Sequence, residues 1–347
     1  MCRHEAERIE MKRYGNLFDR IVSLDNLRLA DEKARKGKKN RYGIRVHDRH
    51  REENILRLHE LLKSGQYRTS PYDTFIIHEP KERVIFRLPY YPDRIVHHAI
   101  MNIMEPIWVG IFTADTCSCI KKRGINEARK RMMRYLVDKE GTRYCLKTDI
   151  HKFYPSVDHE ILKGIVRRKI KDTRLLSLLD EIIDSTDGLP IGNYLSQYLS
   201  NLYLTYLDHH IKEVLKVRYY IRYADDMVFM ASSKAELVRV LDFLKAGLSE
   251  LKLELKGNEQ IFPIADNRED RHGRGVDFVG FVFYHSQTMM RKSIKQSFAR
   301  KCAWLNRTGV AGRNYRMGVS SWLGWAKYSN SYNLCDTISK NKLTWVR

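Results

Sequence analysis

The residues Tyr223-Ala224-Asp225-Asp226 lie between two apolar runs, residues 219–223 and 227–230. Two strand-like runs separated by a two-residue turn predict a β-hairpin that carries Asp225 and Asp226 at its tip. Neighbouring carboxylates beside apolar strands repel each other and lose hydration, so they are poor material for a purely structural turn. The pattern therefore predicts a site for a positively charged ligand at the tip of the hairpin.

Asp149 is the second acidic feature of the chain. It lies at the end of residues 143–150, which are typical of an apolar strand. If the hairpin lies beside this strand, the carboxylates of Asp149 and Asp225 meet although 76 residues separate them. Carboxylate oxygens suit Mg²⁺, which keeps water and substrate phosphates in its remaining positions. We expect two Mg²⁺ ions here, about 3.5–4 Å apart, that activate a hydroxyl and stabilise a leaving pyrophosphate, with Mn²⁺ as a substitute.

The whole chain is strongly basic, because 63 Lys and Arg residues outnumber 42 Asp and Glu residues and give its 347 residues a net charge of +21. Hydrophobic residues at 43% and charged residues at 30% are typical of a folded protein and exclude a disordered one. The charge indicates an anionic partner, with nucleic acid first and an acidic membrane surface second. No segment has the roughly 20 apolar residues that span a bilayer. The six cysteines form no Cys-x-x-Cys pair or zinc-like set, so we expect a reduced, cytoplasmic protein.

Positive charge concentrates in two regions of the chain. Six of the nine residues 33–41 are basic, which is typical either of a solvated loop or of an arm that binds phosphates. The tail, residues 285–347, has twelve basic residues and one acidic residue, interleaved with aromatic rings. The charges predicted to bind nucleic acid are Lys36, Lys38, Lys39, Arg291, Lys292, Lys295, Arg300 and Lys301.

Apolar periodicity predicts the other elements of the chain. Apolar residues at helical spacing from Ile55 to Leu62 predict an amphipathic helix that stops at Gly65, and residues 72–88 predict a hairpin. The further predicted elements are helices over residues 93–104, 124–136, 158–170, 193–217 and 234–251, and a strand over residues 252–255.

Tyr-Ala-Asp-Asp between hydrophobic strands, preceded by the Asp149 strand, resembles the catalytic core of reverse transcriptases, and the resemblance covers about residues 72–325. It implies an α+β right-hand polymerase. A basic extension and the fingers would occupy residues 1–142, a palm with an antiparallel sheet 143–284, and a helical thumb 285–347. Asp149, Asp225 and Asp226 would be the catalytic metal ligands, with the main-chain carbonyl of Ile150 as a further ligand.

The resemblance also implies a nucleotide site. Lys81 and Arg83 would clamp the triphosphate, although either could be an ordinary charge on a hairpin surface. Tyr154, five residues after Asp149, would be the gate against the nucleotide 2′-hydroxyl, and the consecutive Phe153 competes for that role. The remaining nucleotide-binding residues that the resemblance implies are Ile191, Gly192, Gln197 and, more weakly, Lys256.

One departure from the common family pattern points to a branch. After Leu189-Pro190 the chain has Ile191-Gly192 and later Ser196-Gln197, where most members have Gln-Gly and Ser-Pro. This resembles the reverse transcriptases of diversity-generating retroelements, which are bacterial or phage-encoded. The resemblance implies error-prone copying of a template-repeat RNA at adenines. The implied partners are template RNA, the RNA–cDNA duplex, deoxynucleoside triphosphates and a small basic, oligomeric accessory protein, with no membrane.

Two other functions stay open. One is a retron-like, phage-defence or group II intron reverse transcriptase, which keeps the enzymatic activity but changes its role. The other is a catalytically inactive palm that serves as an RNA-binding scaffold. The presence of Asp149, Asp225 and Asp226 favours an enzyme over a scaffold.

Overall fold

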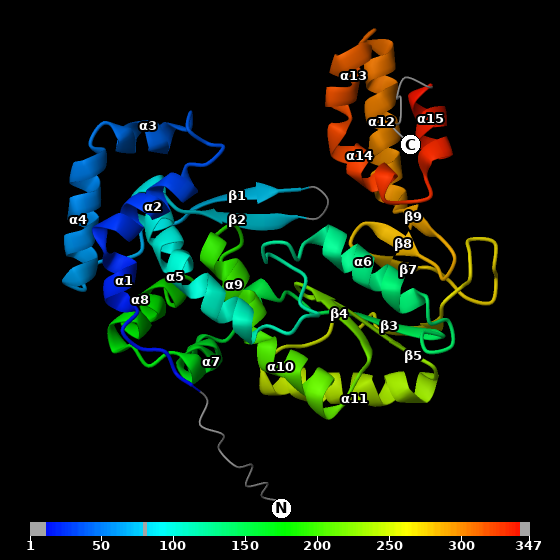
Figure 1. Ribbon diagram of the computed structural model, residues 1–347, viewed down its shortest axis with the longest axis horizontal. Helices are drawn as coiled ribbons and strands as arrows, with labels where there is room; N and C mark the ends of the chain where they lie inside the picture. Colours follow the sequence, from blue (N-terminus) through cyan, green and yellow to red (C-terminus); the bar gives the residue numbers. More distant parts are fainter. Residues whose placement is uncertain (1–11, 79–81, 341–347) are drawn as a thin grey trace, which may run out of the picture. The chain divides into compact units, whose positions relative to one another are not determined.

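The computed structural model describes residues 12–78 and 82–340, which divide into two compact units (Figure 1). The first, here called the helical unit, comprises residues 1–114, 150–210 and 246–254. The second, here called the sheet unit, comprises residues 115–149, 211–245 and 255–347. The predicted triphosphate residue Lys81 lies outside the described residues. Among the described helices, none combines the length and apolar character that crossing a membrane requires.

The helical unit begins with four helices, and the first two of them pack against the fifth. Its elements are α1 (Phe18–Val22), α2 (Leu24–Ala34), α3 (Tyr42–Asp48), α4 (Arg51–Lys63), β1 (Asp73–Ile77), β2 (Arg83–Arg87), a π-helical turn (Tyr90–Arg94), α5 (Ile95–Ile111), a 3₁₀ turn (Tyr154–Ser156), α7 (His159–Lys169), α8 (Thr173–Ile183), α9 (Tyr194–Tyr203) and α10 (Thr205–His209). The helix predicted from Ile55 is confirmed as α4, whose Ile55, Leu58 and Leu62 are buried. The predicted hairpin is confirmed as β1 and β2, which pair antiparallel.

The sheet unit is built on four antiparallel strands in the order β4-β5-β3-β6. They are β3 (Tyr144–Asp149), β4 (Tyr219–Tyr223), β5 (Asp226–Ala231) and β6 (Gln260–Pro263). The hairpin predicted around Ala224 is confirmed, and Ala224 takes a left-handed φ of 56° in its turn. The hairpin lies beside the strand that ends at Asp149, as predicted, because β5 pairs with β3 along its whole length.

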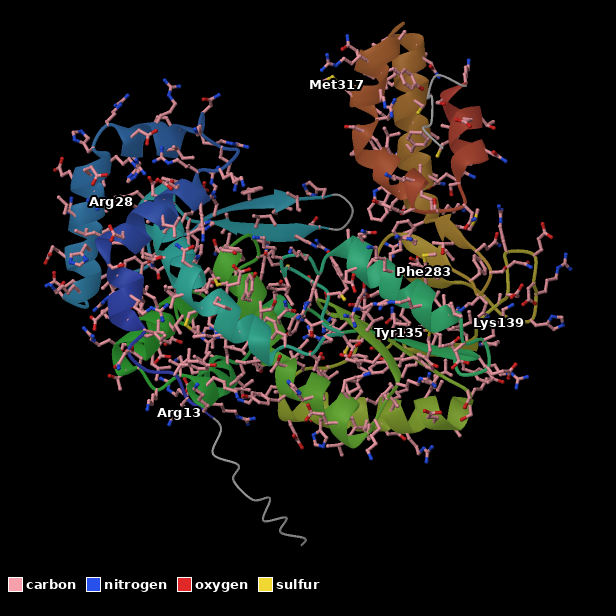
Figure 2. The ribbon with its side chains drawn as sticks, in the orientation of Figure 1. Arg13, Arg28, Tyr135, Lys139, Phe283 and Met317 are labelled. Carbon is pink, nitrogen blue, oxygen red and sulfur yellow. The ribbon has the colours of Figure 1, made fainter. Side chains whose placement is uncertain are left out.

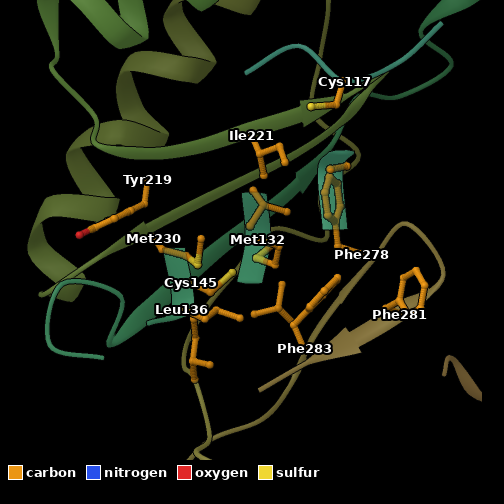
Figure 3. Close-up of a cluster of buried hydrophobic side chains, with 14 of the residues drawn as sticks. Cys117, Met132, Leu136, Cys145, Tyr219, Ile221, Met230, Phe278, Phe281 and Phe283 are labelled. Atoms are coloured by element: carbon orange, nitrogen blue, oxygen red, sulfur yellow. The ribbon is translucent and has the colours of Figure 1, made fainter. Parts of the chain in front are cut away.

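One face of this sheet is covered by α6 (Ile125–Leu136) and by the short strands β7 (Val276–Phe278) and β8 (Phe281–Phe283) (Figure 3). Alternate strand residues such as Cys145 and Met230 point into this layer because successive side chains on a strand face opposite sides. Met132 and Leu136, one helical turn apart on α6, meet Phe283 there. This apolar layer supports the strands that carry the acidic residues.

The tail folds as predicted into helices that have a core of their own. After β9 (Thr288–Met290) follow α12 (Lys292–Arg307), α13 (Gly312–Gly318), α14 (Ser320–Lys327) and α15 (Tyr332–Ser339). The core of this helical group contains Phe298, Cys302, Leu305, Tyr315 and Val319. Met317 projects from α13 into solvent (Figure 2).

Two predicted elements are wrong. The helix expected over residues 193–217 is divided into α9, α10 and a π-helical turn (His210–Val214), and the first break falls at Leu204, where φ is −93° and ψ is −3°. The strand expected over residues 252–255 is absent from the described strands. Lys252 takes a φ of +53° there, and the Leu253 amide closes the end of α11 (Lys234–Glu250) by donating to the Leu248 carbonyl at 2.9 Å.

Candidate active site

Three acidic residues gather where β3 ends and β5 begins in the sheet unit. The strand register places Asp149 directly opposite Asp226. Asp225 follows the left-handed Ala224 in the turn, and its carboxyl group lies within hydrogen-bonding reach of Asp149. The predicted meeting of Asp149 and Asp225 is therefore present in the structure.

The electrostatics of this cluster fit a divalent cation. Burial raises the pKa of the Asp225 carboxyl above its usual range, and the charges of Asp149 and Asp226 raise it further. No group of three or more His, Cys, Asp or Glu side chains in the described residues is already arranged to hold a metal. Mg²⁺ is commonly bound by one or two carboxylates, with water and substrate phosphates as its other ligands. Asp149 and Asp225 supply such a donor pair, whose mutual repulsion a cation would relieve.

Two lysines contact the acidic cluster from the sheet unit. Lys256 Nζ lies 3.3 Å from Asp149 Oδ2, and the Lys256 amide donates to the Asp149 carbonyl at 3.0 Å. Lys147 Nζ lies 4.0 Å from Asp226 Oδ1 and donates to the Asp277 carbonyl at 2.7 Å. Sequence reasoning missed Lys147, although it is two residues before Asp149 and so lies on the same face of β3.

A pocket of about 320 Å³ opens beside these residues within the sheet unit. It is lined by Lys147, Thr148, Asp149, Asp226, Asn258, Gln260, Phe262, Arg274, Gly275 and Asp277. Its charged lining carries both signs, so it suits a ligand with hydroxyl and phosphate groups better than an apolar one. The pocket therefore adds a place for polar substrate atoms next to Asp149 and Asp226.

Arg222 supports the acidic turn from inside the sheet unit. Its side chain is fully buried, and its guanidinium donates to the Ala224 carbonyl at 3.1 Å and to Thr116 Oγ1 at 3.4 Å. A buried guanidinium has a high desolvation cost, so these bonds constrain the turn that carries Asp225. Sequence reasoning missed Arg222, whose only signal is a lone charge within an apolar strand.

The two candidates for the nucleotide gate lie in the helical unit and differ in burial. Phe153 is 3% exposed and packs against Tyr203, with ring centroids 6.5 Å apart. Tyr154 is half-buried, and the Ser200 hydroxyl donates to its phenol oxygen at 3.3 Å. Phe153 is thus a core residue, whereas Tyr154 keeps an accessible edge.

The helical unit also brings the loop around Ile191 to the Tyr154 turn and to β2. The Leu189 amide donates to the Tyr154 carbonyl and the Phe86 amide to the Ile191 carbonyl, each at 2.8 Å. Gly192 has a φ of +114°, and a Cβ there would lie 3.0 Å from the Phe86 carbonyl oxygen, so the close approach requires glycine. The half-buried Gln197 follows on α9, and Arg83 is exposed at the start of β2.

The predicted nucleic-acid-binding residues occupy two places. Lys36, Lys38 and Lys39 are exposed in the loop between α2 and α3 of the helical unit. Lys292, Lys295, Arg300 and Lys301 lie on α12 of the sheet unit, where Lys301 Nζ is 4.2 Å from the centre of the Trp304 ring. Arg291 instead donates to Asp277 Oδ1 at 2.6 Å, so its charge is engaged within the protein.

Known proteins resemble this chain both in sequence and in fold. Residues 78–259 match the family described as reverse transcriptase (RNA-dependent DNA polymerase). Protein YkfC of Escherichia coli strain K12 is 30% identical over 172 residues, which cover 45% of each chain. The retron Ec73 reverse transcriptase of Escherichia coli is 25% identical over 200 residues, which cover 53% of this chain and 62% of that one. The chain thus spans about half of the length of these curated relatives.

A solved structure confirms the predicted fold class. The telomerase from Candida tropicalis, solved with a fragment of telomeric RNA, superposes with a TM-score of 0.50 at 12% identity. The match covers 83% of this chain and 59% of the telomerase. At this identity the likeness concerns the fold alone, and that fold is the right-hand polymerase fold.

Proposed function

Because the chain belongs to the reverse transcriptase family of RNA-dependent DNA polymerases, we propose that it copies RNA into complementary DNA by nucleotidyl transfer. The observation that carries this proposal is the cluster of Asp149, Asp225 and Asp226 at the joined ends of β3 and β5. A protein that served only as an RNA scaffold would gain nothing from three carboxylates that repel both one another and RNA phosphates.

The proposed cofactor is Mg²⁺, as two ions, with Mn²⁺ as a substitute. Asp149, Asp225, Asp226 and the main-chain carbonyl of Ile150 would hold it. When bound, the ions would lower the pKa of the primer hydroxyl and neutralise charge on the leaving pyrophosphate. The chain itself fixes the carboxylates: the β3–β5 register aligns Asp149 with Asp226, and the Arg222 bond to Ala224 supports the turn that carries Asp225.

The proposed nucleotide site takes a deoxynucleoside triphosphate. Arg83 and Lys81 would bind triphosphate oxygens, and the accessible edge of Tyr154 would exclude the 2′-hydroxyl of a ribonucleotide. Phe153 would hold Tyr154 in place from the core, since their ring centroids lie 5.6 Å apart. Ile191, Gly192 and Gln197 would contact the base and sugar. Lys256 would reach a substrate phosphate only by leaving Asp149.

The proposed macromolecular substrates are the template RNA and the RNA–cDNA duplex. The duplex would contact the charges of α12, where Lys292, Lys295, Arg300 and Lys301 precede the exposed Trp304. Cations beside an aromatic ring are typical of surfaces that bind nucleic-acid backbones. A small basic, oligomeric accessory protein would bind the enzyme as a further partner.

We further propose the mutagenic role of a diversity-generating retroelement enzyme, with errors at template adenines. The support is Ile191, whose main chain is fixed by Phe86 while its side chain offers only apolar contact where the common family pattern has Gln. A lost polar contact of about 1 kcal/mol or more weakens discrimination between correct and incorrect pairs. The retron relative supports the alternative role of a retron-like or phage-defence enzyme.

A primer-extension assay tests the proposed activity. Native protein is incubated with a DNA primer on an RNA template, the four deoxynucleoside triphosphates and Mg²⁺, and products are resolved by length. We expect extension that chelation by EDTA abolishes and that Mn²⁺ restores. RNA binding without any extension, with and without an accessory protein, would contradict the proposal and favour a scaffold.

A further inference from the structure

A second basic surface surrounds α3 on the helical unit. We call it the α3 surface, and it consists of Tyr42 with the exposed cations Lys36, Lys38, Lys39, Arg41, Arg45 and Arg49. Within the part of the chain that the structure describes, none of these six cations forms an ion pair with a carboxylate. Asp48 is the only acidic residue between positions 33 and 49, and it pairs with Arg35 at 2.6 Å. The positive charge of the α3 surface is therefore not neutralised by the protein.

The outer face of α3 combines an aromatic ring with these charges. Arg45 and Val46 lie three and four residues after Tyr42, and the C-cap Arg49 lies four and three residues after them, so these side chains share one face of the helix. Tyr42 is 83% exposed, which is unusual for a large ring that could pack elsewhere. The opposite face packs inward through Ile44 and His47.

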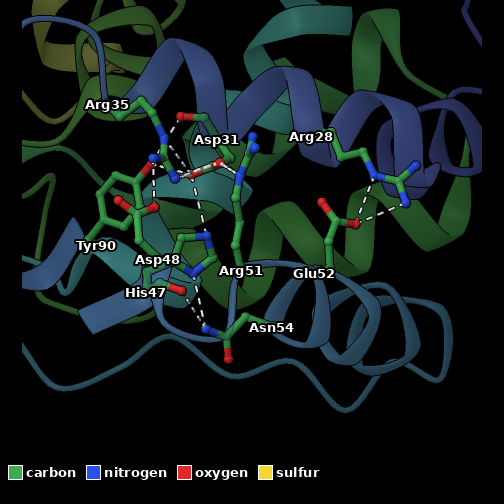
Figure 4. Close-up of polar contacts among 9 residues, drawn as sticks. All are labelled: Arg28, Asp31, Arg35, His47, Asp48, Arg51, Glu52, Asn54 and Tyr90. Atoms are coloured by element: carbon green, nitrogen blue, oxygen red, sulfur yellow. Dashed lines mark hydrogen bonds and ion pairs between the residues drawn. The ribbon is translucent and has the colours of Figure 1, made fainter. Parts of the chain in front are cut away.

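A buried carboxylate, that of Asp31, contacts residues on both sides of the basic loop (Figure 4). Asp31 on α2 is fully buried and accepts hydrogen bonds from Arg35 at 2.8 Å, from Arg51 at 2.7 Å and from the Tyr90 hydroxyl. His47 Nε2 on α3 lies 3.4 Å from the same carboxylate. Asp31 therefore contacts the residue at which the basic loop begins and the helix that follows the loop. A surface held in this way loses little conformational entropy when a ligand binds.

The α3 surface continues toward the loop around Ile191 within the same unit. α3 packs against the π-helical turn Tyr90–Arg94, since a Cβ on Gly43 would lie 3.2 Å from the Cβ of Tyr90. Burial lowers the pKa of Arg94, and the charges of Arg87 and Arg41 lower it further. Arg87 ends β2, and the preceding Phe86 donates its amide hydrogen to the Ile191 carbonyl. The α3 surface thus lies next to the turn that follows β2, the strand that contacts the loop around Ile191, although the charge of Arg87 on β2 is paired with Asp73.

We propose that the α3 surface binds single-stranded RNA, with a base stacked on Tyr42 and phosphates held by Arg41, Arg45 and Arg49. The inference rests on the proposed function, in which the unpaired part of a template needs a binding surface. An aromatic ring among cations suits single strands because every base has a face that stacks. A membrane fits less well, because α3 presents only Tyr42 and Val46 as apolar groups on seven residues.

Binding of a 20-nucleotide, fluorescently labelled, unstructured RNA tests this proposal by anisotropy, without nucleotides or primer. The triple variant Arg41→Gln/Arg45→Gln/Arg49→Gln should bind about tenfold more weakly in moderate salt. Its slope of log affinity against log salt should fall by about 2, as three lost contacts to a single strand imply. Tyr42→Ala should weaken binding about fivefold or more and leave the slope unchanged.

A charge-matched control uses Arg20→Gln/Arg57→Gln/Lys63→Gln, three exposed cations on α1 and α4 of the same unit. We expect it to bind RNA within twofold of native protein, and all variants to keep the native melting temperature. Equal losses in both triple variants would overturn the proposal in favour of diffuse attraction. Native affinity in Tyr42→Ala would overturn the stacking contact, and equal binding of polyglutamate would point to an acidic protein partner.

Primer extension on a template with no unpaired overhang beyond the next few bases separates this proposal from the proposed activity. The α3 variants should extend such a template at the native rate while they bind the longer single strand weakly. If the native protein never extends a primer but the α3 variants bind RNA weakly, the proposed activity is wrong and the proposed RNA-binding surface is supported. Native RNA binding by the variants of an active enzyme would remove the α3 proposal alone.

Discussion

Tyr154 and Phe153 show how consecutive residues of similar chemistry acquire different tasks. Phe153 is buried against Tyr203, while Tyr154 contacts Ser200 and keeps one edge accessible. Only the second side chain is able to touch a nucleotide. The spacing from Asp149 favoured Tyr154 in the sequence but left Phe153 as a competitor, because burial depends on α9, which is distant in sequence.

Substitution of each ring should therefore have a different effect. Tyr154→Ala should reduce discrimination between deoxynucleotides and ribonucleotides by about tenfold or more, because the group that excludes the 2′-hydroxyl is removed. Phe153→Ala should instead lower the free energy of unfolding by about 3–5 kcal/mol. Single-nucleotide incorporation kinetics and urea unfolding measure the two effects. A larger loss of discrimination in Phe153→Ala than in Tyr154→Ala would reverse the assignment.

Ile191 carries the proposed loss of fidelity. Ile191→Gln should lower misincorporation opposite adenine severalfold by restoring a polar contact, while Ile125→Gln on the surface of α6 should leave it unchanged. Sequencing of cDNA made on an adenine-rich RNA template measures both rates. An unchanged error rate at adenines in Ile191→Gln would contradict the proposed role of this side chain.

At the scale of elements, the turn between β7 and β8 packs against the helical tail. Gly280 has a φ of +87°, and a Cβ there would lie 2.4 Å from the ring of Trp325 on α14. On either side of this contact, Phe281 packs against Trp325 with centroids 5.0 Å apart, and Arg291 pairs with Asp277. The turn and the tail therefore pack as one piece within the sheet unit.

A pair of glycine substitutions separates backbone strain from this packing. Gly309 also has a positive φ, but a Cβ added there would meet no atom within 4 Å. Gly309→Ala should cost about 1 kcal/mol of stability from backbone strain alone, and Gly280→Ala about 1–3 kcal/mol more from overpacking. Urea unfolding of the two variants measures the difference. Equal losses of stability in the two variants would show that the Trp325 ring can move to accommodate the added methyl group without destabilising the protein.

The Asp31 cluster joins α2, α3 and α4 in a comparable way. Burial alone would raise the pKa of Asp31, but the nearby His47 and hydrogen bonds from Arg35, Tyr90 and Arg51 hold it well below its usual value. A depressed pKa means that the cluster adds stability above about pH 4, the ordinary pKa of Asp, and loses it as the pH falls further. Asp31→Asn should therefore cost about 3–5 kcal/mol at neutral pH, since two arginines lose a buried partner.

Urea unfolding at several pH values tests this prediction. The stability difference between native protein and Asp31→Asn should shrink below about pH 4, whereas the exposed Asp242→Asn on α11 should match native protein throughout. A difference that grows toward low pH would contradict a depressed pKa in the folded protein.

At the scale of the whole molecule, the sequence predicted the elements that local residue patterns specify. It did not predict side-chain roles that depend on residues distant in the chain. The strands around Asp149 and Ala224 were predictable because apolar runs and a turn specify them locally. The division of the helix over residues 193–217 was not, because no glycine or proline marks the break at Leu204 in the sequence. Lys147 and Arg222 were missed since their roles depend on Asp277 and Thr116, which are distant in sequence.

The basic residues that give the chain its net charge of +21 are concentrated on separate surfaces. One lies on α12, where the proposed duplex would bind, and another is the α3 surface on the helical unit. Asp149, Asp225 and Asp226 form a cluster of acidic residues within this basic molecule. A basic protein that keeps such a cluster is best explained by chemistry on a nucleic acid, with cations bound at the carboxylates.

The rate of single-nucleotide incorporation by Asp225→Asn tests this central claim most directly. The measurement uses a DNA primer on RNA with saturating Mg²⁺, native protein as reference and the exposed Asp242→Asn as the matched control. The account predicts that Asp225→Asn loses at least about a thousandfold in rate, while it still binds the primed RNA and Asp242→Asn keeps native activity. Incorporation by Asp225→Asn at the native rate would contradict it.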